Sequence, residues 1–226
     1  MKERNGNRIC QQPEWSIRLK KGLWLICLLL SIGSLWGQQT VGLFMNDSLA
    51  FNGYTLFAPN SSRTTYLIDN CGLVVNSWTS NFQPGNSCYL LPGGDLLRTA
   101  RVPGQFSGGG LGGRIERFSW EGELEWSYNY LSNDYHQHHD IEPLPNGNIL
   151  VISWDAYSAE EALAAGRAPE LTPSGGIWSE KVVELEPIGS DDAAVVWEWR
   201  LWDHLIQDFD ASKANFGEVA GLPKPA

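Results

Sequence analysis

Short apolar segments separated by turn residues dominate the pattern along this chain, and they predict strands rather than helices. Segments such as 66–69, 114–118 and 181–185 mix polar positions with β-branched, aromatic or aliphatic ones. Pro-Gly-Gly at 92–94 and Pro-Asn-Gly at 145–147 supply the positive φ angles that tight hairpin turns require. We therefore expect a succession of short β-hairpins.

The hairpin pattern repeats. In the first copy, 66–72 (YLIDNCG) leads to Trp78 and then to 89–97 (YLLPGGDLL). In the second copy, 114–122 leads to Trp126, 48 residues after Trp78 (126 − 78), and then to 143–150 (PLPNGNIL). A third copy opens at 181–186 and reaches 195–199, but it has no LPxG hairpin.

Each copy reads as strand, glycine turn, Trp-ended strand, loop, strand, LPxG turn and strand. Four short strands in roughly 50 residues is the period of a β-propeller blade. The predicted fold is therefore all-β: a β-propeller, present as an incomplete arc of about two and a half blades. A β-sandwich also uses hairpins, but it does not repeat this pattern so closely.

The incomplete arc carries an expectation about the whole protein. Propellers close with about four to eight blades, and open strand edges are prone to association. We therefore expect the chain to be the N-terminal part of a larger protein, and the isolated chain to be inactive.

An insertion at 156–176 separates the second copy from the third. Ser158 and Glu161 fit a capping box, and 162–165 followed by Gly166 predict a short helix with a glycine stop. This segment is either a surface excursion or a flap over the mouth of the propeller.

The first 37 residues predict an export signal, with a retained membrane anchor as the alternative. Lys20 and Lys21 precede an apolar run over 22–35 that is shorter than the roughly 20 residues of a spanning helix. The protein is thus expected to be exported, to the periplasm, the cell surface or the medium, and residues 38–226 to form the propeller domain. Any membrane contact would run through an uncleaved N-terminal segment.

The net charge of the chain bears on its binding partners, and its cysteine content bears on disulfide formation. Without residues 1–37 the chain holds 10 basic and 24 acidic residues (16 − 6 and 26 − 2), a net charge of −14. Such a surface repels phosphate backbones, so we expect no nucleic-acid partner. Two cysteines remain, Cys71 and Cys88, and in an exported chain such a pair predicts a disulfide.

Three of the four histidines fall within four residues, at His136, His138 and His139, just before Asp140. They could be metal ligands, acid/base groups or a hydrogen-bonded polar loop. In an extended strand His138 and His139 point to opposite faces while His136 and His138 share one, so a closed metal site would need partners from elsewhere. Without a metal, an imidazole near pKa 6.5 that faces a central funnel suits acid/base or nucleophilic work, with Asp140 to orient it.

A family resemblance favours a catalytic role for the histidine segment over a structural one. Segment 138–150 (HHDIEPLPNGNIL) resembles bacterial arylsulfate sulfotransferases, and 196–210 (VWEWRLWDHLIQDFD) is similar to a signature of that family's exported branch. Segments 160–167 (EEALAAGR) and 212–217 (SKANFG) also resemble it, so the similarity extends over about residues 42–220.

The resemblance implies a six-bladed propeller that moves a sulfuryl group from a phenolic sulfate ester to a phenolic acceptor. The family uses no nucleotide donor, so no cofactor is expected, and the group is carried as sulfohistidine with ping-pong kinetics. Its small-molecule partners would be an aryl sulfate donor and a phenol. Other histidines and an arginine bind the sulfate oxygens.

The family resemblance assigns site roles to only a few residues of this sequence. The resemblance makes His139 a channel residue that binds the sulfate or exchanges a proton with the phenol oxygen, with His138 as second choice. Asp140 is the expected neighbour in the substrate site. Arg98, which follows the first LPGGDLL strand, is a possible anion-binding residue. The nucleophile belongs to later blades of the family and is not identified in this sequence.

Other conspicuous residues have structural readings. His204 and the strand-end tryptophans Trp78, Trp126, Trp197 and Trp199 are expected to pack between blades, whereas Trp154 and Trp178 could stack on an aryl group. The glycine-rich 108–113 lacks the lysine and context of a phosphate loop and is expected to be flexible.

The sequence also fits two rival functions. One is a secreted propeller that only binds ligands or acts as a scaffold. The other is a metal- or quinone-dependent oxidoreductase.

Overall fold

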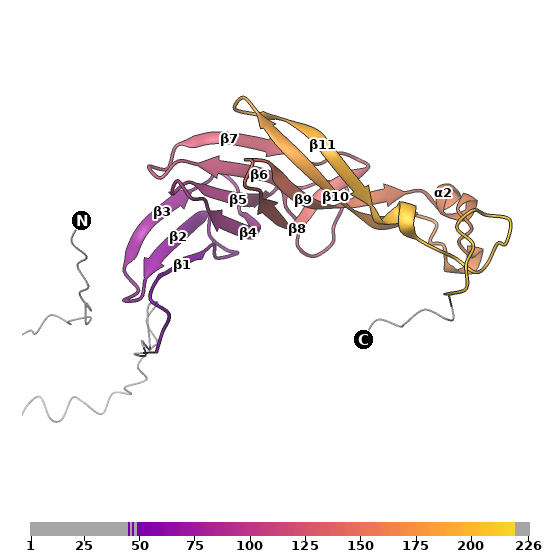
Figure 1. Cartoon of the computed structure of the whole chain (residues 1–226), viewed down its shortest axis with the longest axis horizontal. Coiled ribbons are helices and arrows are strands. Elements are labelled where there is room, and N and C mark those ends of the chain that lie inside the picture. Colours follow the sequence, from indigo (N-terminus) through magenta and orange to yellow (C-terminus); the bar gives the residue numbers. More distant parts are fainter. Residues whose placement is uncertain (1–44, 46, 48, 220–226) are drawn as a thin grey trace, which may run out of the picture.

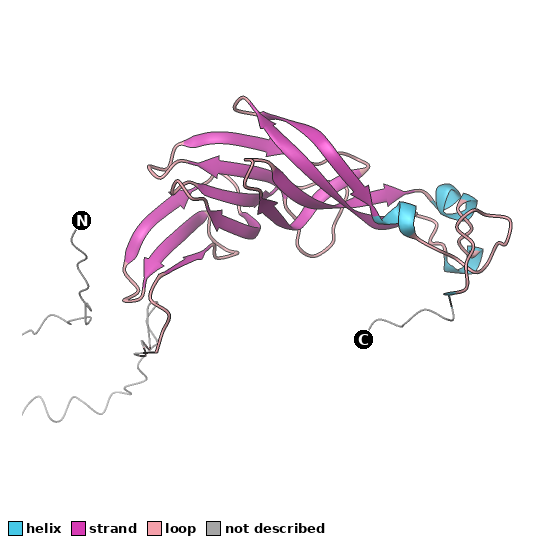
Figure 2. Ribbon diagram, in the orientation of Figure 1, coloured by secondary structure: helices cyan, strands magenta, loops and turns pink. Residues whose placement is uncertain are grey.

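The computed structural model describes residues 45, 47 and 49–219, and this part of the chain is mostly β, with three antiparallel sheets (Figures 1 and 2). The first sheet contains β1 (Tyr54–Phe57), β2 (Thr64–Asp69) and β3 (Val74–Thr79). The second contains β4 (Pro84–Leu90), β5 (Leu96–Arg101), β6 (Gly113–Phe118) and β7 (Leu124–Asn129). The third contains β8 (Tyr135–Pro143), β9 (Ile149–Tyr157), β10 (Ile177–Ile188) and β11 (Asp192–Arg200). The predicted all-β class is confirmed, and the predicted export signal lies outside the described residues.

Each sheet is a meander in which consecutive strands are neighbours, and the sheets follow one another along the chain (Figure 1). The first strands lie next to one another, because β1 contacts β4 and β4 contacts β8. The last strands of the second and third sheets, β7 and β11, also meet. Over the described residues the three sheets do not close into a ring (Figure 2).

The sheet boundaries fall in the middle of the predicted repeat. The glycine-turn hairpin β2–β3 belongs to the first sheet, whereas the LPGG hairpin β4–β5 opens the second. Likewise, the LPNG hairpin β8–β9 opens the third sheet, and β10–β11 completes it. The third copy, β10–β11, shares its sheet with the LPNG hairpin that precedes it, and the sequence after it contains no LPxG motif.

Apolar side chains fill the space between successive sheets. Leu96 on β5 packs towards the first sheet with Leu67, Trp78 and Phe118. Its neighbour Leu97 packs towards the third sheet instead, because adjacent side chains of a strand point to opposite faces. The second sheet is therefore buried on both faces.

Two tryptophans tie the sheets together by the same contact. The indole of Trp78 on β3 donates to the carbonyl of Ser119 in the β6–β7 turn at 2.8 Å. The indole of Trp126 on β7 donates to the carbonyl of Asp192 at the β10–β11 turn at 2.9 Å. Packing between sheets is thus confirmed for these two, but Trp197 on β11 is 48% exposed.

The insertion forms the predicted helix, α2 (Ala159–Ala164). Ser158 and Glu161 make the reciprocal capping-box hydrogen bonds, and Gly166 follows with a φ of 92°. Two 3₁₀ turns, η1 (Pro169–Leu171) and η2 (Leu201–His204), complete this end of the molecule. Among the described residues, no helix is apolar and long enough to cross a bilayer.

The predicted disulfide between Cys71 and Cys88 is wrong, because Cys88 carries a free thiol. Cys88 lies on β4 and packs against the apolar cluster between the first and second sheets, while Cys71 lies in the turn after β2. Burial raises the pKa of the Cys88 thiol, as expected for a cysteine that serves as a small apolar side chain.

Candidate functional site

The histidine segment forms a bulge in β8, the first strand of the third sheet. Tyr135, His136 and Gln137 pair with β9, and the regular pairing resumes only at Ile141. His139 has a φ of 51°, the one positive value of a non-glycine residue in the described part of the chain. Such backbone is strained by roughly 1–2 kcal/mol for a residue with a Cβ, so its neighbours must hold it in place.

The bulge brings the two adjacent histidine rings together. Their Nδ1 atoms lie 2.8 Å apart, with the rings nearly perpendicular at 89°. The expectation that His138 and His139 point to opposite faces is therefore wrong. It assumed extended backbone, whereas the left-handed conformation of His139 turns its ring towards His138.

Two residues from β9 and β10 hold His138. Trp154 on β9 stacks on its ring with centroids 4.3 Å apart, and Glu180 on β10 places Oε2 2.7 Å from Nε2. Glu180 pairs with Trp154 across the sheet, and Trp154 pairs with His136, so one row of the sheet carries all three. The expected sharing of one face by His136 and His138 is confirmed by their common contact with Trp154.

The glycine-rich loop expected to be flexible packs directly on this cluster. The backbone N–H of His139 donates to the carbonyl of Gly110 at 2.7 Å, and Leu111 forms a β-bridge with His138. A Cβ added at Gly110 would collide with the His139 ring, and one at Gly108 would collide with Trp154. Glycine is needed here because the loop backbone lies against the rings.

His136 is fully buried and uses neither ring nitrogen in a hydrogen bond. Burial lowers the pKa of His136; the Gly112 backbone opposes this shift, although it does not lie at hydrogen-bond geometry. Burial also lowers the pKa of His138, against the opposing effect of Glu180. Of the three, only His139 is exposed.

Asp140 does not orient a histidine. Its Oδ1 accepts hydrogen bonds from the hydroxyl of Tyr89 on β4 and from the backbone N–H of Ile141, both at 2.9 Å. Burial and this carboxylate raise the pKa of Tyr89 to about 12. Asp140 therefore joins the bulge to the neighbouring sheet, while its own side chain stays exposed.

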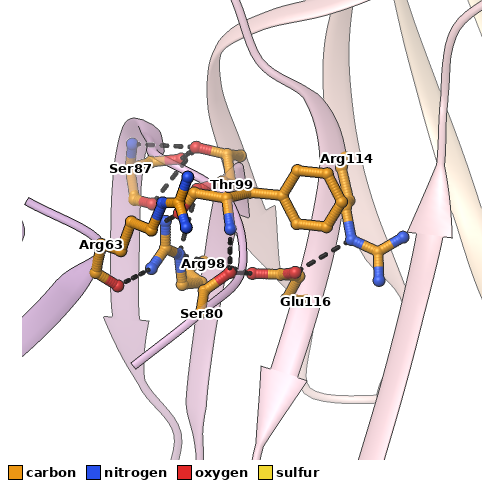
Figure 3. Close-up of polar contacts among 8 residues, drawn as sticks. Arg63, Ser80, Ser87, Arg98, Thr99, Arg114 and Glu116 are labelled. Carbon is orange, nitrogen blue, oxygen red and sulfur yellow. Dashed lines mark hydrogen bonds and ion pairs between the residues drawn. The ribbon is translucent and has the colours of Figure 1, made fainter. Parts of the chain in front are cut away.

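Arg98 lies elsewhere, in the interface between the first and second sheets (Figure 3). It is 1% exposed, and its guanidinium bonds the carbonyls of Arg63 and Phe82 and lies 3.7 Å from Glu116. Ser80 and Arg114 also bind Glu116, at 2.8 and 2.9 Å. The structure does not bring Arg98 to the histidines, because its side chain leaves β5 on the face opposite to the third sheet.

The structure also locates His204 and Trp178, for which the sequence predicted packing between blades and stacking on an aryl group, respectively. His204 is exposed and stacks on Trp199 with centroids 5.0 Å apart, a contact between β11 and the adjoining η2 and not the expected packing between sheets. Trp178 lies beside Trp154 and Phe106, at 5.4 and 4.8 Å between centroids, and is 48% exposed. Trp178 is thus the open edge of the ring cluster around His138.

Glu180 is the residue that the sequence did not reveal. Its local pattern, in 177–185, is that of any strand with alternating faces. The informative signal is the register that sets Glu180 opposite Trp154 and Trp154 opposite His136, and this register depends on strand pairing rather than on spacing.

Neither a metal site in the described part of the chain nor a match to a known protein identifies the role of this arrangement of side chains. Within the described residues, no group of three or more His, Cys, Asp or Glu side chains is arranged to hold a metal ion. No protein-family model matches the chain, and no curated protein matches it. The resemblance to arylsulfotransferases therefore depends on the sequence segments quoted above.

Proposed function

We propose that the three sheets are blades of a β-propeller and that the protein is an aryl sulfotransferase. It would move a sulfuryl group from a phenolic sulfate ester to a phenol. The observation that carries the proposal is the imidazole pair of His138 and His139, held on the first strand of its sheet with the His139 ring exposed.

The arrangement of the sheets supports the propeller. In such a fold the first strand of each blade lines the axis, and here β1, β4 and β8 are consecutive neighbours. The indole contacts of Trp78 and Trp126 recur from sheet to sheet, as expected for a radial repeat. A ring on β8 that turns out of the sheet would then face the axial funnel.

The chemistry needs a group that can exchange a proton with a phenol oxygen. When the donor is consumed, a sulfur–nitrogen bond forms on a nucleophilic histidine, the sulfur–oxygen bond breaks, and the departing phenolate takes a proton. In the second half, the acceptor phenol gives up its proton as its oxygen bonds sulfur and the sulfur–nitrogen bond breaks. His139 is the exposed imidazole for both proton transfers.

The proposed nucleophile is a different histidine, which in the family that the sequence resembles belongs to later blades. His136 is fully buried and therefore not open to a sulfate ester, and His204, although exposed, stacks on Trp199 and not on the imidazole pair. Arg98 is committed to backbone carbonyls and Glu116, and it is not proposed as an anion-binding group.

The test is sulfuryl transfer from 4-nitrophenyl sulfate to phenol by the full-length protein, followed by release of 4-nitrophenolate and formation of phenyl sulfate. His139→Ala is expected to lower kcat/KM by at least about 100-fold, the usual scale for a proton-transfer group. His204→Ala is the control and should stay within about threefold of the wild type. No transfer by the wild-type protein would overturn the proposed function, and a loss of less than about threefold in His139→Ala would remove His139 from the site.

A further inference from the structure

The contacts of Glu180, His138 and His139 form a chain of hydrogen bonds with one consistent direction. An ionised carboxylate only accepts hydrogen bonds, so the 2.7 Å contact with Glu180 requires a proton on Nε2 of His138. In the neutral ring the other nitrogen, Nδ1, then carries a lone pair and acts as an acceptor.

The second contact follows from the first. Since Nδ1 of His138 is an acceptor, the 2.8 Å contact between the two Nδ1 atoms requires the proton to be on Nδ1 of His139. In the neutral pair, two ring nitrogens carry no proton, Nδ1 of His138 and Nε2 of His139. Because Nδ1 of His138 accepts the hydrogen bond from His139, only Nε2 of His139 keeps a free lone pair.

The surroundings keep the chain in place. Trp154 stacks on His138, and the Gly110 carbonyl holds the backbone of His139 in its left-handed conformation. Because Gly110 has no side chain, the His139 ring can lie against the loop without displacement. Neither ring can turn over without losing a hydrogen bond.

We propose that Glu180 is a positioning residue that acts through His138 to hold His139 with Nδ1 protonated and Nε2 free as a base. Its part in sulfuryl transfer depends on the proposed function, but the protonation pattern does not. In the transfer reaction Nε2 of His139 would take the proton of the acceptor phenol as its oxygen bonds sulfur, and the imidazolium so formed would give that proton to the phenolate that departs from the next donor molecule.

The test uses the ¹⁵N and ¹H signals of the histidine rings in the purified chain at neutral pH, where four histidines make assignment practicable. Wild type should show a protonated Nε2 on His138 and a protonated Nδ1 with an unprotonated Nε2 on His139. Glu180→Ala removes the acceptor, so both rings should change to a mixture of tautomers. Glu180→Gln keeps an acceptor oxygen and should largely restore the wild-type pattern.

Glu184→Ala is the matched control. Glu184 lies four residues along the same face of β10 and accepts from Asn146 and Asn148, not from a histidine. Its loss should leave all ring signals in place. A wild-type His139 protonated on Nε2 in its neutral form, or unchanged rings in Glu180→Ala, would overturn the proposal.

Transfer kinetics separate this proposal from the proposed function. In an active full-length protein, Glu180→Ala should lower kcat by at least about 10-fold with less effect on KM, and Glu180→Gln should recover part of it. If the ring signals follow the expected pattern but no transfer occurs in wild type, the sulfotransferase is rejected and the hydrogen-bonded chain stands. If transfer occurs in wild type but Glu180→Ala leaves the ring signals unchanged, the sulfotransferase stands and the positioning role of Glu180 is rejected.

Discussion

His136 shows how one buried ring makes folding depend on pH. Its nitrogens have no hydrogen-bond partner, and burial lowers its pKa below the ordinary value of 6.5. Above about pH 6.5 both the folded and unfolded chains carry it neutral, and its contribution to stability is complete. As the pH falls below that value, the unfolded chain binds the proton first, so the free energy of unfolding falls.

Replacing His136 with Gln should therefore flatten the acid side of the stability profile. Urea unfolding between about pH 7.5 and 5 is the measurement, and the wild type should lose more stability over that range than His136→Gln. His138 is the neighbouring group whose pKa is also lowered, and it stays in both proteins; because the charge of His136 is the smallest of the causes of that shift, most of the effect of His138 cancels in the comparison. Equal slopes would show that His136 takes up its proton without opposition in the folded state.

At the scale of elements, β5 and β6 carry a buried charge network that faces the first sheet (Figure 3). Glu116 on β6 accepts hydrogen bonds from Ser80 and Arg114 and forms an ion pair with Arg98. The Arg98 guanidinium also donates to the carbonyls of Arg63 and Phe82. These contacts join the second sheet to the segments between β1 and β2 and between β3 and β4. Removing one buried charge leaves its partner uncompensated, which is strongly destabilising.

Glu116→Gln is expected to lower the free energy of unfolding by roughly 3 kcal/mol, measured by urea denaturation. Glu125→Gln is the control, because Glu125 pairs with Arg117 on the surface, where ion pairs contribute less than about 1 kcal/mol. A Glu116 variant no less stable than the Glu125 variant would show that the network does not hold the sheets together.

At the scale of the whole molecule, a tryptophan side chain joins the first sheet to the second and another joins the second to the third, whereas the corresponding tryptophan of the third sheet is left exposed. Trp78 and Trp126 are each 1% exposed and reach the following sheet, whereas Trp197 has no following sheet among the described residues. Leu150, Ile152 and Val182, on the outer face of the third sheet, are also only partly buried. The same residue type thus has different energetic weight according to its place in the arc.

Trp126→Ala should destabilise the chain by roughly 3 kcal/mol or more, because it empties the space between the second and third sheets. Trp197→Ala, at the equivalent strand position, should cost less than about 1 kcal/mol. Urea denaturation of the two variants provides the comparison. Equal losses would contradict the difference in packing between these two positions.

The sequence by itself determined the local elements of this protein, because these depend on neighbouring residues. Alternation and turn chemistry located the hairpins around 92–94 and 145–147, and Ser158 with Glu161 located α2. The assignment of Trp78 and Trp126 to packing between sheets was also accessible, since a repeated aromatic at a strand end has few other uses.

Only the tertiary structure decided which hairpins share a sheet, which way Arg98 points, and that Cys88 stays a free thiol. It also decided the site, where a bulge turns His139 onto His138 and strand register brings up Glu180. These outcomes depend on pairing between segments far apart in the chain. A shift of one residue in that pairing reverses every side chain, and no tight turn sets the register between β9 and β10, because the insertion with α2 and η1 joins them.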